Sequence, residues 1–431
     1  MKISKILMTL SAAFLLCNCS SDGGGLAKAE TKDPQGGSGI KAHAKVDYSK
    51  GRAMNARLGK GINLGNAWDG NSYWNCGTLK KGDDFVYTNL NGETKTITLG
   101  GSDDFFFGNI PAERYNDGCT DRLDASWSNP IKDEYFAFLK QAGFNSIRLP
   151  VRWQHNSDPI NHTINPERLA GVLEDVKLAV DAGLAVVISF HWYYEIMFAA
   201  NHAKTNPDLY DAEMYHFISL WSQAAAALNA FPDDMIVFDI LNEPSMTSAD
   251  RLNEVMNVGY QAIRAAAPNK TIMFESFHAA KFADISSLEL PQDGNIIYSG
   301  HYYEPYGFTH QGHSYACAGD AAYAMNAAAD LNTYVTTVNA LYPDVNGGGV
   351  PLNMGEFGVS GGEGANKSSC DPGTTPPTNA AKARWAAGAI AAAEALGISW
   401  HYWGFVGVGG FEAYDKGSGT WLEGFPAAFG L

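Results

Sequence analysis

Cysteine, basic residues and long apolar runs are all scarce in this chain of 431 residues. There are six cysteines and no Cys-x-x-Cys pair, which argues against a structural zinc site. Lys and Arg number 30 against 46 Asp and Glu, a net charge of −16, so we expect no nucleic-acid partner. The hydrophobic fraction of 45% with scattered charges excludes a disordered chain or a coiled coil.

The longest N-terminal apolar run, Ile6–Leu16, follows a basic start and is too short to span a bilayer. We therefore predict a signal peptide over residues 1–19 and an exported protein. Cys19, followed by a Ser/Gly tether, resembles the lipid-bearing residue of a bacterial lipoprotein, although Asn18 stands where a small residue is usual. Secretion and outer-surface lipid anchoring are weighed equally, and residues 20–44 are expected to form a flexible linker.

Four cysteines remain beyond that segment, and in an exported chain they suggest two disulfides. Three pairings are open. We favour Cys76–Cys119 and Cys317–Cys370, because each would join neighbouring loops, over free buried thiols.

Short buried runs alternate with amphipathic segments along most of the chain. Asn129 and Asn165 each precede a proline and are predicted to cap a helix, and glycines end the helical patterns. Strands that alternate with helices pair in parallel, and no Gly-x-Gly-x-x-Gly follows the first strand to favour a dinucleotide fold. We therefore predict a single (β/α)8 (TIM) barrel over residues 45–431. Its eight strands would be Gly61–Gly65, Ser146–Leu149, Ala185–Phe190, Ile236–Leu241, Ile272–Glu275, Ile296–His301, Leu352–Gly355 and Ser399–Trp403.

A large insertion, about residues 71–128, separates the first strand from the first helix. It contains a predicted hairpin, Phe85–Leu90 with Thr94–Leu99, around the turn Asn91-Gly92. An insertion of this length is expected to form one wall of the cleft.

Polar and aromatic residues gather where the predicted strands end, which in such a barrel is the face that carries the active site. Any one of them alone is better interpreted as a loop or core residue; their coincidence on several strands favours a site. Two carboxylates across a sugar-sized gap are what glycoside hydrolysis requires, and aromatic faces stack on pyranose rings. The residues are Asn63, Asn66, Trp68, Arg148, His191, Trp192, Asn242, Glu243, Glu275, His301, Tyr303, Glu356 and Trp403.

Other chemistries find less support in the sequence. No His-Glu-x-x-His motif is present, and His310 and His313 are more simply interpreted as solvated or substrate-facing than as ligands, so no metal or other cofactor is expected. No strand end carries the lysine that a barrel aldolase would need for a Schiff base.

The chain resembles glycoside hydrolase family 5, the cellulase-type retaining enzymes. Ile236–Ser245, which closes on Asn-Glu-Pro, looks like the family's fourth-strand signature, and Asn353–Gly358 is similar to its seventh-strand nucleophile motif. Supporting pieces follow in family order between residues 61 and 404. They are Gly61–Asn66, Ile147–Pro150, Phe190-His191, His301–Tyr303 and Trp400–Trp403.

The resemblance implies a role for each matching residue. Glu243 would be the acid/base and Glu356 the nucleophile, Asn242 would bind the sugar 2-hydroxyl, and Trp403 would form the platform beside the scissile bond. Arg148 and Tyr303 would hold Glu356 ionised, while His191 and His301 would line the reacting subsite, His301 on the Glu243 side. Asn66, Trp68 and Trp192 are further expected substrate contacts. Trp74, Trp127 and Trp153 join Trp68 and Trp192 as candidate sugar platforms, with a core position as the alternative for each of the five. Trp221 is expected in the core.

The resemblance implies an endo-β-1,4-glucanase that cuts cellulose or a related β-glucan by double displacement. We expect a monomer. The first-loop insertion, and Trp192 to Tyr194 in place of a second histidine found in some relatives, leave β-mannan, xyloglucan and xylan as alternatives. A different class, a surface glycan-binding lipoprotein without catalysis, stays open but does not account for the full set of catalytic side chains.

Overall fold

The computed structural model describes the barrel domain but not the whole chain. It describes residues 42–70, 84–88, 93–98, 129–158, 161–312, 316–361, 370, 374–407 and 409–431. The predicted signal peptide, Cys19, most of the linker and insertion, Trp74, Trp127, Cys76, Cys119 and His313 lie outside these residues. Within them, no helix has the length and apolar character needed to cross a membrane.

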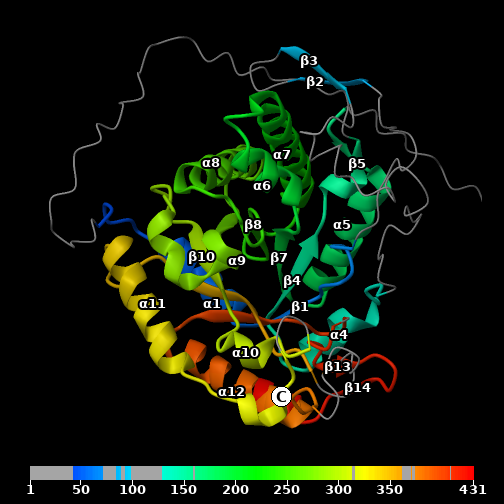
Figure 1. The fold of residues 1–431 in the computed structure, drawn as a ribbon, viewed down its shortest axis with the longest axis vertical. Helices are drawn as coiled ribbons and strands as arrows, with labels where there is room; N and C mark the ends of the chain where they lie inside the picture. Colours follow the sequence, from blue (N-terminus) through cyan, green and yellow to red (C-terminus); the bar gives the residue numbers. More distant parts are fainter. Residues whose placement is uncertain are drawn as a thin grey trace, which may run out of the picture. The chain divides into compact units, whose positions relative to one another are not determined.

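Eight parallel strands close into a barrel in the order β1-β12-β11-β10-β9-β8-β7-β4, which confirms the predicted fold (Figure 1). The predicted strands are all present, with ends that differ by at most two residues. The strands are β1 (Lys60–Asn63), β4 (Ser146–Val151), β7 (Ala185–Phe190), β8 (Ile236–Asp239), β9 (Thr271–Phe274), β10 (Ile296–Tyr302), β11 (Leu352–Phe357) and β12 (Ser399–Tyr402).

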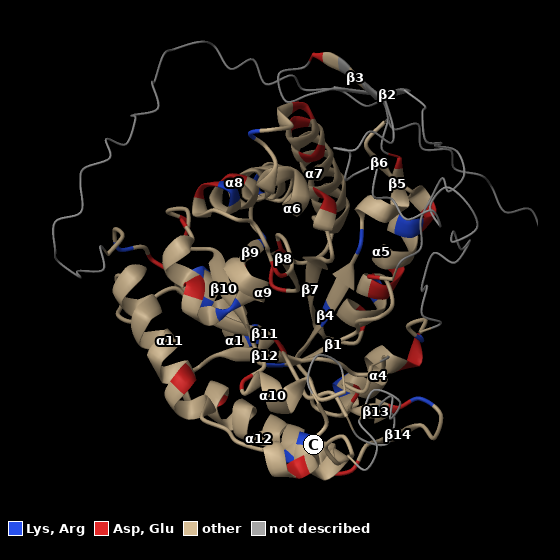
Figure 2. Ribbon diagram, viewed as in Figure 1, with Lys and Arg blue, Asp and Glu red and all other residues tan. Residues whose placement is uncertain are grey.

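Helices surround the strands (Figure 1), and acidic and basic residues are interspersed on them (Figure 2). The helices are α1 (Ser49–Leu58), α4 (Glu134–Gln141), α5 (Pro166–Asp181), α6 (Tyr194–Asn201), α7 (Pro207–Leu228), α8 (Ala249–Ala266), α9 (Phe277–Ala280), α10 (Tyr306–Thr309), α11 (Ala327–Leu341), α12 (Asn379–Ala395) and α13 (Phe425–Phe429). The 3-10 turns are η1 (Gln154–Asn156), η2 (Phe282–Ser287) and η3 (Gly319–Ala322).

Among the described residues, three two-stranded pairs flank this framework. The predicted hairpin of the insertion is present as β2 (Asp84–Thr88) and β3 (Thr94–Thr98), antiparallel in register. Two short antiparallel pairs were not predicted: β5 (Ser157–Asp158) with β6 (Thr163–Ile164), and β13 (Tyr414–Asp415) with β14 (Thr420–Trp421).

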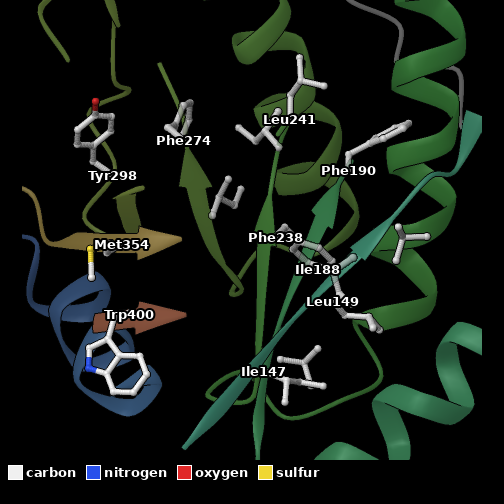
Figure 3. Close-up of a cluster of buried hydrophobic side chains, with 14 of the residues drawn as sticks. Ile147, Leu149, Ile188, Phe190, Phe238, Leu241, Phe274, Tyr298, Met354 and Trp400 are labelled. Carbon is white, nitrogen blue, oxygen red and sulfur yellow. The ribbon is translucent and has the colours of Figure 1, made fainter. Parts of the chain in front are cut away.

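Alternation along each strand divides the core into two buried layers. Side chains such as Ile147, Ile188 and Phe238 belong to the large cluster formed with the helices (Figure 3). The intervening residues point inward, because successive side chains of a strand face opposite sides. At the end of the barrel where the strands begin, these inward residues are apolar and pack against Met54 and Leu58 of α1. The sequence pattern did not predict this helix.

The two predicted helix caps have different outcomes. Asn165 caps α5, since its side chain accepts from the backbone N–H groups of Glu167 and Arg168. The prediction for Asn129 was wrong, because α4 starts only at Glu134. The Asn129 amide instead donates to the carbonyls of Gly65 and Val406, so it joins the loops after the first and last strands.

Two further predictions bear on the chain's connections. Cys317 and Cys370 form a disulfide, with the Sγ atoms 1.97 Å apart, as favoured above. His43, which we placed in the linker, already belongs to the domain: its ring stacks on Tyr342 with centroids 4.3 Å apart, and its N–H donates to Leu341.

Candidate active site

Polar residues occupy the inward positions at the end of the barrel where the strands terminate. Asn63, Arg148, Ser189 and Asp239 come from four adjacent strands and are fully buried. Pairing sets Asn63 beside Arg148 and Ser189 beside Asp239. The apolar lower layer thus supports a polar floor beneath the strand ends, where TIM barrels hold their reacting groups.

Arg148 is the centre of this floor. Its Nη1 donates to Glu356 Oε1 at 2.6 Å, and its Nη2 donates to Asn242 Oδ1 at 2.6 Å. Its Nε and Nη2 both donate to Asp239 Oδ2, at 3.2 and 2.9 Å. A planar guanidinium offers five donors in a fixed fork, so one buried side chain can orient several acceptors at once.

Glu356 reaches the floor through an irregularity in β11. Asn353 and Gly355 face inward, and a Cβ on Gly355 would lie 2.6 Å from Ser299 Oγ. Strict alternation would therefore turn Glu356 outward. The register against β10 shifts at this point, so that His301 pairs with Glu356. Such a bulge re-aims one side chain, and here it brings the carboxylate to Arg148.

The surroundings of Glu356 act on its charge in opposite directions. Tyr303 donates to Glu356 Oε2 at 3.1 Å, and burial raises the pKa of this tyrosine well above its usual value, which keeps it a donor. Burial raises the pKa of the Glu356 carboxyl, and the opposing charges of His301 and Arg148 only partly offset the rise. Both expected contacts to Glu356, from Arg148 and from Tyr303, are thus present.

Glu243 follows β8 with a backbone φ of +51°, a left-handed conformation that is uncommon for a residue with a side chain. Its carboxylate Oε1 lies 2.8 Å from His301 Nδ1, and its side chain is 30% exposed where that of Glu356 is 7% exposed. One carboxylate oxygen of each glutamate and one His301 nitrogen all lie within 4.8 Å of one another.

His301 connects the carboxylates as a cation. Its Nε2 lies 3.2 Å from Glu275 Oε1 and its Nδ1 lies 3.7 Å from Glu356 Oε2. Burial alone would lower the pKa of His301, but the charges of Glu356 and Glu275 outweigh it and raise that pKa well above its usual value. An imidazolium has no nitrogen lone pair, so these three side chains suit acid–base work better than metal binding.

Trp403 and His191 form one wall of the site. Their rings are parallel within 6°, with centroids 5.6 Å apart. Gly65 passes close beneath the indole, and a Cβ there would lie 2.3 Å from the Trp403 ring, so only glycine fits. Burial and the nearby Arg148 lower the pKa of His191 well below its usual value, which keeps this ring neutral.

A family model described as cellulase (glycosyl hydrolase family 5) matches residues 112–407, more than half of the chain. The chain belongs to glycoside hydrolase family 5.

Individual relatives agree with this family. The chain is 30% identical to endoglucanase B of Ruminococcus albus over 39% of its own length and 44% of the relative's. It is 26% identical to a xyloglucan-specific endo-β-1,4-glucanase of Bacteroides ovatus, over 56% and 52% of the two lengths. The chain thus spans about half the length of these curated relatives. The endoglucanase Cel5A of Thermotoga maritima shares the fold, with a TM-score of 0.60, 24% identity and coverage of 89% of this chain and all of that one.

Two of the predicted family 5 sugar platforms are core residues instead. Trp153 is fully buried, and Trp68 is 8% exposed, with its Nε1 donating to Asp175 Oδ2 at 2.6 Å. The Arg168 guanidinium lies over the Trp68 ring, 4.6 Å from its centroid. Trp68 therefore joins β1 to α5 and presents no face to a sugar. Trp221 is buried as predicted.

Trp192 and Asn66 remain partly exposed at the strand ends, as a substrate contact requires. Trp192 packs edge-on against Tyr194, which is 44% exposed and which we did not predict. Trp192 and Asn66 also have positive φ, at 58° and 59°. Asn66, Trp192 and Glu243 all have a left-handed backbone, so strained residues lie around the open end of the barrel.

Sequence reasoning missed three buried acids of the site. Asp239, the polar break in β8, was not assigned a role although it binds Arg148. Glu275 was recognised as a strand-end residue but given none. Asp69, fully buried in the loop after β1, lies 4.0 Å from His191 Nε2. Each of these acids lies within or soon after a buried run. Acidic residues at such positions are common, so one sequence does not identify them as part of a site.

A cavity of about 490 Å³ opens beside Glu243 and His301. Its other walls come from α9, η2, α10 and α11 and carry Phe282, Tyr306 and Tyr334. Tyr306 is 38% exposed and stacks on His310, whose ring centroid lies 3.8 Å away. His310, predicted to be solvated or substrate-facing, is thus part of an aromatic pair at the rim.

Proposed function

We propose that this family 5 member is a retaining endo-β-1,4-glucanase, with Glu356 as nucleophile and Glu243 as acid/base. The observation that carries the proposal is the closeness of their carboxylate oxygens, within 4.8 Å. Retaining glycosidases separate these groups by about 5–5.5 Å, whereas inverting enzymes leave about 6.5–9.5 Å for a water molecule. The gap therefore suits direct attack on the sugar rather than attack by an interposed water.

In the first step, a Glu356 oxygen bonds to the anomeric carbon while the glycosidic C–O bond breaks. The departing oxygen takes the proton of the Glu243 carboxyl group. In the second step, water attacks the same carbon, the bond to Glu356 breaks, and the Glu243 carboxylate accepts the water proton. The lesser exposure of Glu356 suits the attacking role, because a desolvated carboxylate reacts without first shedding water.

Asn242 and Trp403 would hold the reacting sugar. Arg148 occupies the Asn242 carbonyl oxygen, which leaves the amide nitrogen to donate to the 2-hydroxyl, a contact that strengthens in the transition state. The partly exposed indole of Trp403 offers a flat face beneath the ring. The leaving-group sugar would enter the cavity beside Glu243, where Tyr306 supplies an exposed aromatic face.

The names of the relatives support a β-1,4-glucan as the substrate, since most of the similar curated proteins are named endoglucanases. Xyloglucan is the second candidate, because the Bacteroides ovatus relative is specific for it. Structures of the Thermotoga maritima enzyme contain cellobiose or mannotriose, so mannan stays an alternative substrate. Xylan stays an alternative on the sequence argument alone. A binding protein without catalysis would have no need of an ion-paired nucleophile.

We further propose that the protein is exported from a bacterium as a monomer. The basic start and apolar run support a signal peptide, and the bond between Cys317 and Cys370 suits an oxidising compartment. Cys19 would carry a lipid if the protein is anchored at the outer surface. Mass spectrometry of the mature N-terminus distinguishes an acylated Cys19 from a plain cleavage product.

Initial rates on a panel of polymers test the substrate. Carboxymethylcellulose, mixed-linkage β-glucan, xyloglucan, glucomannan and xylan are compared at equal mass concentration, with product sizes measured at early times. We expect the highest rate on a glucan and products of several lengths. A clear preference for mannan or xylan would overturn the glucanase assignment, and release of a single short product would overturn endo action. Glu243→Gln and Glu356→Gln should each lose at least about 1,000-fold in rate while still binding polymer.

A further inference from the structure

Glu275 lies immediately after β9, fully buried beneath the reacting carboxylates. Its two oxygens contact different parts of the machinery around Glu243. Oε2 accepts the backbone N–H of Glu243 at 2.7 Å, and Oε1 lies 3.2 Å from His301 Nε2. This one carboxylate therefore reaches Glu243 by two routes, through its backbone and through the histidine at its side chain.

The backbone route bears on a strained residue. Glu243 has a φ of +51°, a conformation that costs free energy for any residue with a Cβ and that persists only where neighbours enforce it. A charged acceptor on its N–H is such a neighbour, because hydrogen bonds to an ionised group are short and strong. Glu275 thereby fixes the direction in which the Glu243 side chain leaves the strand end.

The side-chain route depends on the charge of Glu275. Burial favours the neutral acid, but the cations His301 and Arg148 and the Glu243 N–H outweigh it and lower the pKa of Glu275. Asp239 is equally buried, yet burial and the charge of Glu275 raise its pKa to about 7. Glu275 is thus the ionised support. The titratable and charged groups around His301 and Glu275 include Arg148, His191, Asp239, Glu243, Tyr298, Tyr303 and Glu356.

We propose that Glu275 is the positioning residue of the acid/base: it holds the Glu243 backbone and keeps His301 a cation that donates to the Glu243 carboxylate. The inference rests on the proposed function, since it assigns Glu243 the proton transfers. It matters most in the covalent intermediate, when Glu356 is a neutral ester and no longer attracts the charge of His301. Glu275 then remains as the fixed counter-charge, while Glu243 accepts the proton of water.

Two substrates with different leaving groups distinguish this positioning role from general damage to the site. A 2,4-dinitrophenolate departs without a proton, whereas 4-methylphenolate needs one from Glu243. A defect in the placement of Glu243 should therefore spare the first step for the activated substrate alone. Azide attacks the anomeric carbon without a general base, breaks the bond to Glu356 and releases a glycosyl azide, so it should bypass Glu243 in the second step.

The test compares Glu275→Gln with Asp239→Asn on the two aryl β-cellobiosides. For Glu275→Gln we expect kcat/KM to fall about 100-fold with the 4-methylphenyl substrate and less than about threefold with the dinitrophenyl substrate. The kcat of Glu275→Gln on the dinitrophenyl substrate should also fall, and azide should restore it. Asp239→Asn, which removes a buried acid that contacts Arg148 but neither His301 nor Glu243, should lower kcat/KM equally for both substrates, without azide rescue.

Equal losses on both substrates for Glu275→Gln, or no azide rescue, would overturn the proposal. Inactivity of the wild-type protein on both cellobiosides would instead refute the proposed function. If Glu275→Gln does not fold, ¹⁵N-histidine NMR of the wild type trapped with a 2-deoxy-2-fluoro cellobioside decides the matter, with His301 identified through His301→Gln. A protonated His301 at pH 7 in that adduct is expected, and a neutral one would overturn the proposal.

Discussion

Replacing Arg148 by methionine should lower the free energy of unfolding more at neutral pH than at acidic pH. The substitution keeps an apolar stem of similar length but removes a fully buried cation that contacts Asp239, Glu275 and Glu356. Removing one partner of a buried ion pair typically costs about 3–5 kcal/mol, because the remaining charge stays buried without compensation. We expect a loss of this size in the free energy of unfolding at pH 7.5.

The loss should shrink on acidification. Without Arg148 the pKa values of Asp239 and Glu356 rise further above their unfolded values, and that of Asp239 is already about 7. A raised folded pKa contributes stability below the unfolded pKa, and this contribution is lost as the pH rises through the folded pKa. The variant therefore recovers stability relative to the wild type as the pH falls, by up to about 1.4 kcal/mol for each pKa unit by which the substitution raises one carboxyl.

Urea unfolding followed by tryptophan fluorescence at pH 7.5 and pH 5.0, at constant ionic strength, measures both effects. Lys177→Met is the matched control, because it removes a cation from the exposed pair Lys177–Asp181 and should leave the free energy of unfolding nearly unchanged at either pH. A loss below 1 kcal/mol for Arg148→Met, or a loss that is the same at both pH values, would refute the reasoning.

Three other predictions concern parts of the domain away from the reacting carbon. Trp68→Ala should cost about 3–5 kcal/mol of stability and leave KM for soluble β-glucan unchanged; a rise in KM at unchanged stability would restore it as a sugar platform. Burial lowers the pKa of His162 to about 4 and that of His216 well below 6.5, so their stabilising contribution, present above pH 6.5, is lost as the pH falls toward 4. His162→Gln should therefore flatten the decline in melting temperature between pH 6.5 and 4, and an unchanged slope would contradict this account. Replacing Cys317 and Cys370 by serine should lower the free energy of unfolding by about 2–4 kcal/mol, and no change on reduction of the wild type would contradict a stabilising bond.

The fold could be predicted because each strand and helix carries its own local signal. Buried runs placed all eight strands, most of them after a glycine, and Asn165 before a proline gave one helix start. Asn129 carries the same local signal but bonds to two loops distant in sequence, so tertiary contacts override it. Helix α1 was missed because its apolar residues are few and gain their burial only from the closed barrel.

The site could be predicted in part, where a strand end implies an inward side chain. Glu243 and Arg148 follow this rule. Glu356 follows it only through the bulge in β11, which the sequence does not reveal and which the family motif supplied. Trp68 shows the limit, since a tryptophan after a strand can face the cleft or an outer helix, and the deciding contact, Asp175, lies over a hundred residues away.

The stereochemistry of the first product tests the central claim most directly. Proton NMR during hydrolysis of a cellooligosaccharide, before mutarotation, resolves the anomer that the enzyme releases. Retention through Glu356 predicts the β-anomer first, and a 2-deoxy-2-fluoro cellobioside should label the peptide that contains Glu356. Initial release of the α-anomer, or a label on any other residue, would contradict the account.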